Sequence, residues 1–193
     1  MKTQNLKFGE AVKTLANFAG MQPYTFSKQD EEREKNWKEY KSIFSRYVEK
    51  YHDELFKNPS AESAKNYIKS RNLTAEEVKK FKIGFVTNNQ NTFEEFSKNF
   101  DKKILKETGL FYFDDKKNKF IERFKDRVIF PINNISGDPI GLGGRTIKSS
   151  SYLAKYINSP ETPFFKKGSN LYNLDRARTV SYTHLTLPTM DSV

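Results

Sequence analysis

The strongest constraint in the sequence is a row of large apolar side chains that recurs at steps of three and four residues. Such a row forms one side of an α-helix, and it lies in a protein core far more often than it stacks on bases. We therefore predict one long amphipathic helix that begins near a capping box of Ser27 and Asp30 and ends at Asn58-Pro59. The members of the row are Trp37, Tyr40, Phe44, Tyr47, Tyr51 and Leu55.

Four shorter helices are expected around this long one. Their apolar residues recur at helical spacing, and two of them begin with a threonine that is followed three residues later by glutamate, the pattern of a capping box. The expected segments are Phe8–Ala19, which Gly20 ends, residues 61–70, a helix that opens at Thr74 with Glu77, and a helix that opens at Thr92 with Glu95.

The apolar period changes toward two after residue 110, which predicts strands. Two pairs of strands flank turn signals and are expected to be antiparallel. The predicted fold is therefore α+β, with N-terminal helices followed by a mostly antiparallel, mixed sheet. The expected strands are residues 81–87, 110–113, 120–124, 127–132 and 140–145, with turns at residues 114–118 and 136–138.

Charge and composition restrict the classes of partner. The formal net charge is +10, from 34 Lys+Arg against 24 Asp+Glu. This favours a polyanion such as nucleic acid, although a lysine-rich solubilising surface is the alternative. The absence of cysteine excludes disulfides and a thiolate zinc site within the chain. No apolar run is long enough for a membrane span and no signal peptide is present, so we expect a cytoplasmic protein without a membrane partner.

Three segments carry candidate binding residues. The first is residues 123–132, RFKDRVIFPI. If this segment is a strand, Arg123, Lys125 and Arg127 share one face and Asp126 points to the other. Three like charges on one face repel one another, so a structural role is unfavourable unless acidic residues or a bound anion neutralise them. The alternative is a solvated edge strand that its charges protect from pairing.

The second segment, residues 137–145, places three glycines just before Arg145. Glycines allow a close approach of the backbone, which would let Arg145 lie beside a phosphate or a base. The spacing fits neither a dinucleotide fingerprint nor a P-loop, and the glycines alone are equally consistent with a bent strand.

The third segment, residues 154–168, is an extended stretch that prolines stiffen, and Lys155 and Lys167 bracket it. Lysine serves a phosphate as a flexible point charge. Asn158 and Ser159 are able to bond a nucleotide, but local turn bonds are the commoner role for such residues.

In this order and spacing, the three segments resemble the bacterial DnaG-type DNA primases. The matching strings are R-F-x-x-R-V-I-F-P-I, then G-D-x-I-G-x-G-G-R, then K-Y-x-N-S-P-E-T-x-x-F-x-K-G-x-x-L-Y. Residues 67–71 (YIKSR) and 81–85 (FKIGF) resemble an upstream part of the same family, and residues 8–21 resemble the helix that closes its zinc-binding module. The resemblance covers residues 6–178.

The resemblance implies an intact enzyme that makes short RNA primers on a single-stranded DNA template from nucleoside triphosphates during replication. It also implies Mg²⁺ or Mn²⁺ at the polymerase centre, Zn²⁺ in the preceding module, and a replicative helicase bound through a C-terminal domain. Carried across by motif, the template-binding cations are Arg71, Arg123, Lys125, Arg127, Arg145, Lys155 and Lys167, with Lys155 and Asn158 as nucleotide-binding candidates.

By the same resemblance, residues 1–22 are the end of the zinc-binding module with its linker. Residues 23–168 are the basic N-terminal subdomain of the polymerase core, residues 169–178 begin the Toprim domain, and residues 179–193 resemble a non-native tail. The family's zinc ligands and its Glu-Gly-Tyr-x-Asp motif are not found here. We therefore expect no catalytic residue, no bound metal and no polymerase activity from this chain alone.

Two residues depart from the family pattern. Lys125 stands where an arginine is usual, which puts a bidentate contact there in doubt. Asn173 stands where a glycine is usual, but asparagine tolerates a left-handed backbone. Two other functions stay open on the sequence alone: a fragment of a primase–helicase fusion, as in some phages, and a non-catalytic module that binds single-stranded nucleic acid.

Overall fold

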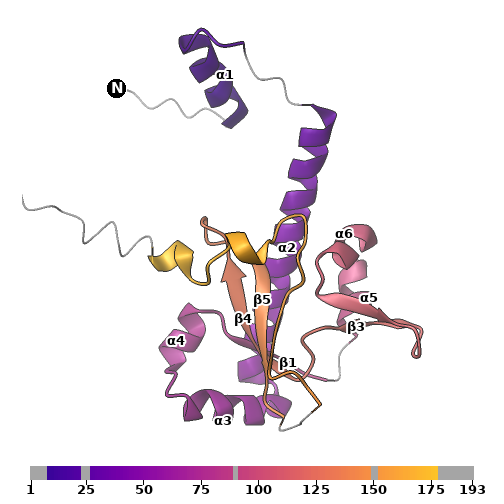
Figure 1. The fold of residues 1–193 in the computed structure, drawn as a ribbon. Helices are drawn as coiled ribbons and strands as arrows, with labels where there is room; N and C mark the ends of the chain where they lie inside the picture. Colours follow the sequence, from indigo (N-terminus) through magenta and orange to yellow (C-terminus); the bar gives the residue numbers. More distant parts are fainter. Residues whose placement is uncertain (1–7, 23–26, 89–90, 149–151, 178–193) are drawn as a thin grey trace, which may run out of the picture. The chain divides into compact units, whose positions relative to one another are not determined.

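The computed structural model describes residues 8–22, 27–88, 91–148 and 152–177 (Figure 1). The chain divides into two units, residues 1–36 and 37–193. The first unit holds α1 (Phe8–Phe18), which confirms the first predicted helix, and the start of α2 (Lys28–Lys57). Gly20 adopts a φ of +64° just after α1, the left-handed conformation that commonly ends a helix.

The long helix α2 has the predicted ends. The backbone N–H of Ser27 donates to Asp30 Oδ2 at 3.0 Å, and the N–H of Asp30 donates to Ser27 Oγ at 3.2 Å, which is the expected capping box with aspartate in the place of glutamate. After α2, the Asn58 side chain caps the short 3₁₀ helix η1 (Pro59–Ala61) by accepting from the N–H of Ser60.

The aromatic row of α2 is buried, as predicted. In the second unit it packs on side chains from the sheet and from the helices that precede the hairpin, and its members also contact one another. The rings of Tyr47 and Tyr51, for example, meet edge to face with their centroids 4.7 Å apart. The buried apolar members of the row are Tyr40, Phe44, Tyr47, Tyr51 and Leu55, while Trp37 is partly buried.

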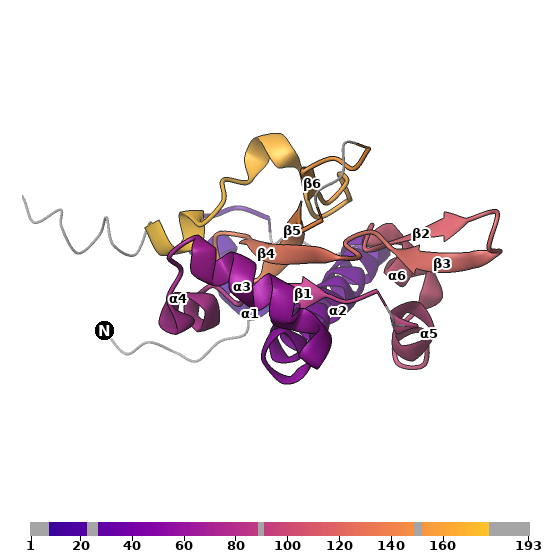
Figure 2. The same cartoon turned by 90° about the horizontal axis from the view of Figure 1, so that it is seen from below.

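A four-stranded antiparallel sheet with the order β1-β4-β5-β6 lies beside α2 (Figure 1). A separate two-stranded hairpin, β2–β3, extends away from this sheet (Figure 2). Both predicted antiparallel pairs are present, and the α+β fold is confirmed. The strands are β1 (Gly84–Val86), β2 (Phe111–Asp114), β3 (Lys119–Glu122), β4 (Arg127–Asn133), β5 (Pro139–Thr146) and β6 (Tyr156–Asn158).

Four short helices complete the described part of the second unit. They are α3 (Glu62–Ser70), α4 (Ala75–Lys80), α5 (Thr92–Ser97) and α6 (Lys102–Glu107). Thr74 and Glu77 form the predicted capping box of α4. Ile68 of α3 and Val78 of α4 bury their side chains in a second apolar cluster together with Val128 of the sheet. None of the helices in the described ranges is both long and apolar enough to cross a membrane.

Three local predictions are wrong or incomplete. The first strand begins only at Gly84, because Phe81 and Lys82 close α4 and Lys82 adopts a φ of +50°. Thr92 does not cap α5: its hydroxyl is bonded to the buried Tyr51 hydroxyl at 2.7 Å, and the N-cap residue is Asn91. Helix α6, which Asp101 caps, was not predicted.

The predicted strand over residues 127–132 is confirmed as β4, but residues 123–132 do not form one continuous strand. Residues 123–126 form a turn between β3 and β4, and Asp126 adopts a φ of +56°. Arg123, Lys125 and Arg127 therefore do not share one strand face. The edge-strand alternative fails as well, because β4 lies between β1 and β5 in the sheet.

Two of the glycines before Arg145 make room for aromatic rings. A Cβ on Gly144 would lie 2.5 Å from a ring atom of Phe124, and a Cβ on Gly141 would lie 3.1 Å from the Phe165 ring. Gly143 has only ordinary contacts within 4 Å. Close packing of β5 therefore accounts for Gly141 and Gly144.

Candidate nucleic-acid interface

Arg145 is the cation that the fold fixes most firmly. It lies on β5 and pairs with Val128 of β4 and Tyr156 of β6. Its guanidinium carbon is 3.9 Å from the centroid of the Tyr67 ring and 5.8 Å from that of Tyr156, and both distances are typical of cation–π contacts. Its Nη1 donates to the carbonyl of Thr146, whereas its buried Nε has no hydrogen-bond partner within the described residues.

Arg71 reaches the same aromatic ring from helix α3. Its Nε donates to the Tyr67 hydroxyl at 3.1 Å, and its guanidinium carbon is 5.3 Å from the ring centroid. Tyr67 and Arg71 are four residues apart on consecutive turns, a spacing that places two side chains on the same side of a helix. The fold thus brings together two cations that are 74 positions apart in the sequence, Arg71 and Arg145. Tyr67, Arg71, Arg145 and Tyr156 are termed the arginine–tyrosine cluster.

Tyr156 gives this cluster an open aromatic surface. The side chain is 62% exposed and lies on β6, the outer strand of the sheet. Asn158, two residues further along β6, is exposed and pairs with Gly143. Ser159 is buried, and its Oγ accepts from the N–H of Leu142 at 2.9 Å. Of the two polar neighbours, Ser159 therefore bonds the backbone of β5, 17 positions earlier in the chain, and Asn158 faces solvent.

Arg127 has a different role from the one expected. Arg127 is only 7% exposed, and burial lowers the pKa of its guanidinium. Its Nη1 lies 3.4 Å from the carbonyl oxygen of Lys155, which also accepts from the N–H of Thr146 at 3.1 Å. Arg127 thus holds the backbone of Lys155, whose own side chain is exposed.

Arg123 lies where the loop after β6 meets the start of the hairpin. Its Nε donates to the carbonyl of Gly109 at 2.7 Å, and its guanidinium carbon is 5.9 Å from the Tyr112 ring. Gly109 packs so closely on Pro160 that a Cβ there would overlap the proline ring. Since Pro160 follows Asn158 by two residues, Arg123 adjoins the end of β6.

Lys125 and Lys167 lie elsewhere around this region. Lys125 is half-buried, and its charge partly opposes the burial that raises the pKa of the Glu122 carboxyl. Lys167 is exposed in the short helix η2 (Lys167–Ser169), and its backbone N–H donates to Glu161 Oε1 at 3.3 Å. These contacts place Lys125 beside the core and Lys167 beside the loop that follows β6.

The sequence prediction missed the aromatic members of the cluster. Tyr67 and Tyr156 stand inside the strings that match the family, but the prediction named only the cations of those strings and Asn158. The signal for Tyr67 was its spacing of four residues from Arg71 within a predicted helix. The signal for Tyr156 was its place beside Lys155 in an extended segment.

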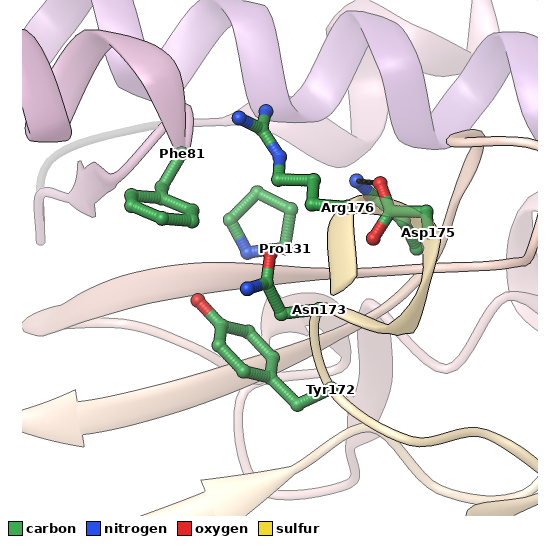
Figure 3. A pocket seen from close by; sticks show the side chains of 7 residues that line it. Phe81, Pro131, Tyr172, Asn173, Asp175 and Arg176 are labelled. Atoms are coloured by element: carbon green, nitrogen blue, oxygen red, sulfur yellow. Dashed lines mark hydrogen bonds between the residues drawn. The ribbon is translucent and has the colours of Figure 1, made fainter. Parts of the chain in front are cut away.

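A small pocket lies where the end of the described chain meets β4 and α4 (Figure 3). The guanidinium carbon of Arg176 is 4.9 Å from the Phe81 ring, and Asn133 Nδ2 donates to Asp175 Oδ2 at 3.1 Å. The pocket measures about 10 Å³, room for one water molecule and not for a nucleotide. Asn173, at its rim, has a φ of +64°, so the asparagine does adopt the left-handed backbone.

The metal ions implied by the resemblance do not fit the residues present. In the described part of the chain, no three or more His, Cys, Asp or Glu side chains gather closely enough to hold a metal ion. His52 is buried, and its Nδ1 is bonded to the carbonyl of Ile83 at 2.7 Å.

Comparison with known proteins places this fold in one family. The family model "DNA primase catalytic core, N-terminal domain" matches residues 50–178. The DNA primase of Lactococcus lactis is 35% identical over 182 residues, which cover 92% of this chain and 28% of the relative. The chain therefore spans less than a third of the length of that relative.

Solved structures give the same answer. A DnaG primase catalytic domain bound to single-stranded DNA has a TM-score of 0.68 and 32% identity, covering 76% of this chain and 45% of that one. The RNA polymerase domain of Mycobacterium tuberculosis DnaG, in complex with double-stranded DNA that has a 6-nucleotide overhang, also has a TM-score of 0.68, with 26% identity, covering 76% of this chain and 46% of that one. The α+β core, the matching strings and these likenesses together show that this chain belongs to the bacterial DnaG family of DNA primases.

Proposed function

We propose that residues 23–168 form the template-binding subdomain of a primase RNA-polymerase core, and that single-stranded DNA crosses the arginine–tyrosine cluster. The observation that carries this proposal is the pair of guanidiniums gathered around Tyr67. The net charge of +10 and the DNA held by the two solved relatives support it.

The cluster has the parts that a sequence-tolerant site needs. An arginine guanidinium presents donors in a rigid fork that suits phosphate oxygens. Tyr156 offers an exposed ring on which any base can stack. Lys155 and Asn158, exposed on either side of Tyr156, are the proposed nucleotide contacts.

The role in the whole enzyme follows from family membership. In it, this subdomain would hold the template while short RNA primers are made from nucleoside triphosphates during replication in the cytoplasm. Residues 169–178 would begin the Toprim domain, whose Mg²⁺ or Mn²⁺ ions perform the transfer, and residues 1–22 would lead from a Zn²⁺-binding module. A replicative helicase would bind a C-terminal domain. The chain by itself would not polymerise, because phosphoryl transfer of this kind needs the metal ions.

Removing both guanidiniums of the cluster tests the proposal. We expect Arg71→Ala with Arg145→Ala to weaken binding of fluorescent oligo(dT) by at least about tenfold at low salt, since each charged hydrogen bond contributes about 1.5–3 kcal/mol. The slope of log K against log[salt] should fall by about 0.7 for each phosphate that the variant no longer neutralises. Fluorescence anisotropy across a salt series measures both quantities.

The matched control is Lys57→Ala, which removes a charge that pairs with Asp53 on the exposed end of α2. This variant should keep the wild-type slope. Equal slopes for the double arginine variant and the wild type would contradict the proposed path.

The two exposed lysines that bracket the third segment give a second prediction. Lys155→Gln with Lys167→Gln should weaken oligo(dT) binding at low salt and flatten the salt slope, because both side chains are solvent-exposed cations near the outer strand. The same titration measures this. Unchanged affinity would remove these lysines from the template path.

A further inference from the structure

The β2–β3 hairpin exposes two neighbouring aromatic residues in different surroundings. Tyr112 is 44% exposed and Phe113 is 46% exposed. Successive side chains of a strand point to opposite faces, so the two rings lie on opposite sides of the hairpin. Phe113 meets Phe120 edge to face at 5.2 Å, and Phe120 in turn stacks on Phe93 at 4.1 Å. The Phe113 side of the hairpin thus belongs to the core.

The Tyr112 side of the hairpin carries a fixed cation instead. Tyr112 pairs across the hairpin with Ile121. The guanidinium carbon of Arg123 is 5.9 Å from the Tyr112 ring, and its Nε is anchored at 2.7 Å on the carbonyl of Gly109. Tyr112 and Arg123 thus place an exposed ring beside a guanidinium on the hairpin. Tyr156 and Arg145 form the same combination on the sheet.

The two sites lie on segments that are in contact. Gly109, which anchors Arg123, packs directly on Pro160. Pro160 follows the outer strand β6, on which Asn158 and Tyr156 lie, and Tyr156 pairs with Arg145. The backbone that anchors Arg123 therefore contacts the segment just beyond the strand that carries Tyr156.

Charge around the hairpin favours a polyanion over an apolar partner. Its turn and strands carry three cations, Lys116, Lys117 and Lys119, against two carboxylates outside the core, Asp114 and Asp115, and Arg123 follows directly after β3. Asp114 is already engaged, since its Oδ1 accepts from the N–H groups of Lys116 and Lys117 at 3.0 and 3.2 Å.

We propose that Tyr112 stacks on a base of single-stranded nucleic acid that continues past the arginine–tyrosine cluster, while Arg123 holds the adjacent phosphate. This inference rests on the proposed function, because it extends the same path. It adds a base-stacking residue on the hairpin to cations that the family strings already indicate. Stacking on an aromatic ring is sequence-tolerant, as a template site requires.

The test compares strands with and without bases. In the full chain, Tyr112→Ala should weaken binding of oligo(dT) by about tenfold, within the range that loss of one stacked base produces. The same variant should bind an abasic strand of equal length as the wild type does, because that strand keeps the phosphates and lacks the rings. Tyr112→Trp should restore oligo(dT) binding. Anisotropy titrations at one low salt concentration measure all of these affinities.

Phe113→Ala is the matched control, since it removes a ring of similar exposure from the same strand on the opposite face. It should leave both affinities unchanged. Equal losses for Tyr112→Ala and Phe113→Ala, or a loss on the abasic strand as large as on oligo(dT), would overturn the stacking role. Circular dichroism melts check that each variant is folded.

The outcomes also separate this inference from the proposed function. If Arg71→Ala with Arg145→Ala weakens binding and Tyr112→Ala does not, the template path stands and the hairpin site is wrong. If the wild-type chain does not bind oligo(dT) at low salt, both are wrong. Binding of a protein in place of oligo(dT) would assign the hairpin to a different partner.

Discussion

Gly84→Ala is expected to lower the free energy of unfolding by about 3 kcal/mol, the upper part of the range for overpacking a core. A Cβ at this position would lie 2.8 Å from the carbonyl carbon of Tyr51 and 2.9 Å from the backbone nitrogen of His52. Both atoms belong to the backbone of α2, which cannot move aside as a flexible side chain can. Strand β1 would have to separate from the helix, and the aromatic row of α2 would pack less closely on the sheet.

Urea unfolding, followed by the fluorescence of the single tryptophan, Trp37, measures this effect. Trp37 packs against Phe164 with their ring centroids 5.3 Å apart, so its emission reports on the folded core. Gly143→Ala is the control, because a Cβ there would meet Asn158 Oδ1 at 3.4 Å, an ordinary contact. It should change stability by less than about 0.5 kcal/mol. A Gly84→Ala chain with the wild-type midpoint would show that β1 and α2 are not in close contact.

Glu122→Gln is expected to stabilise the chain at pH 8 by as much as about 3 kcal/mol, and to have little effect near pH 4. Glu122 is 4% exposed and lies beside the hydroxyls of Tyr51, Thr92 and Tyr47. The Tyr51 hydroxyl donates to Glu122 Oε1, whereas Glu122 Oε2 is buried without a hydrogen-bond partner in the described ranges. Burial raises the pKa of the carboxyl from 4.5 to about 7, although the hydroxyls and Lys125 act in the opposite direction.

The sign of the pH effect follows from which state binds more protons. Between pH 4.5 and about 7, the unfolded chain has lost the Glu122 proton and the folded chain still holds it. Stability must therefore fall as pH rises through this window, and then stay level above it. Glutamine cannot ionise, so the variant should lack this slope.

Urea midpoints of both proteins at a series of pH values measure the difference. Glu95→Gln serves as the control, since Glu95 is an exposed partner of Lys50 and should leave the slope in place. Parallel curves for the wild type and Glu122→Gln would show that Glu122 is ionised in the folded chain throughout this range.

Local signals in the sequence were sufficient for most of the fold. The aromatic row of α2, the caps at Ser27 and Thr74, and the turn between β4 and β5 each depend on residues close together in the chain, and each was confirmed. One of the failures involves a distant partner. Thr92 was expected to cap a helix, but its hydroxyl is bonded to Tyr51, 41 positions earlier.

For the candidate site as well, the sequence indicated the residues but not the contacts that depend on distant segments. The family strings indicated Arg71 and Arg145, and the fold does bring them together on Tyr67. The strings could not show that Arg127 turns inward, because its partner is the carbonyl of Lys155, which reaches it only when β5 and β6 pair. The left-handed backbone of Asp126, which interrupts the expected row of three cations, likewise has no signal in the local pattern.

The outermost strands of the sheet, β1 and β6, are each only three residues long. An exposed edge strand can pair with a strand from a second copy of the chain. Short edge strands are one way in which natural sheets prevent this pairing. Pro160, two residues beyond β6, has no N–H with which to prolong such pairing. The described sheet is therefore poorly suited to edge-to-edge association between copies of the chain.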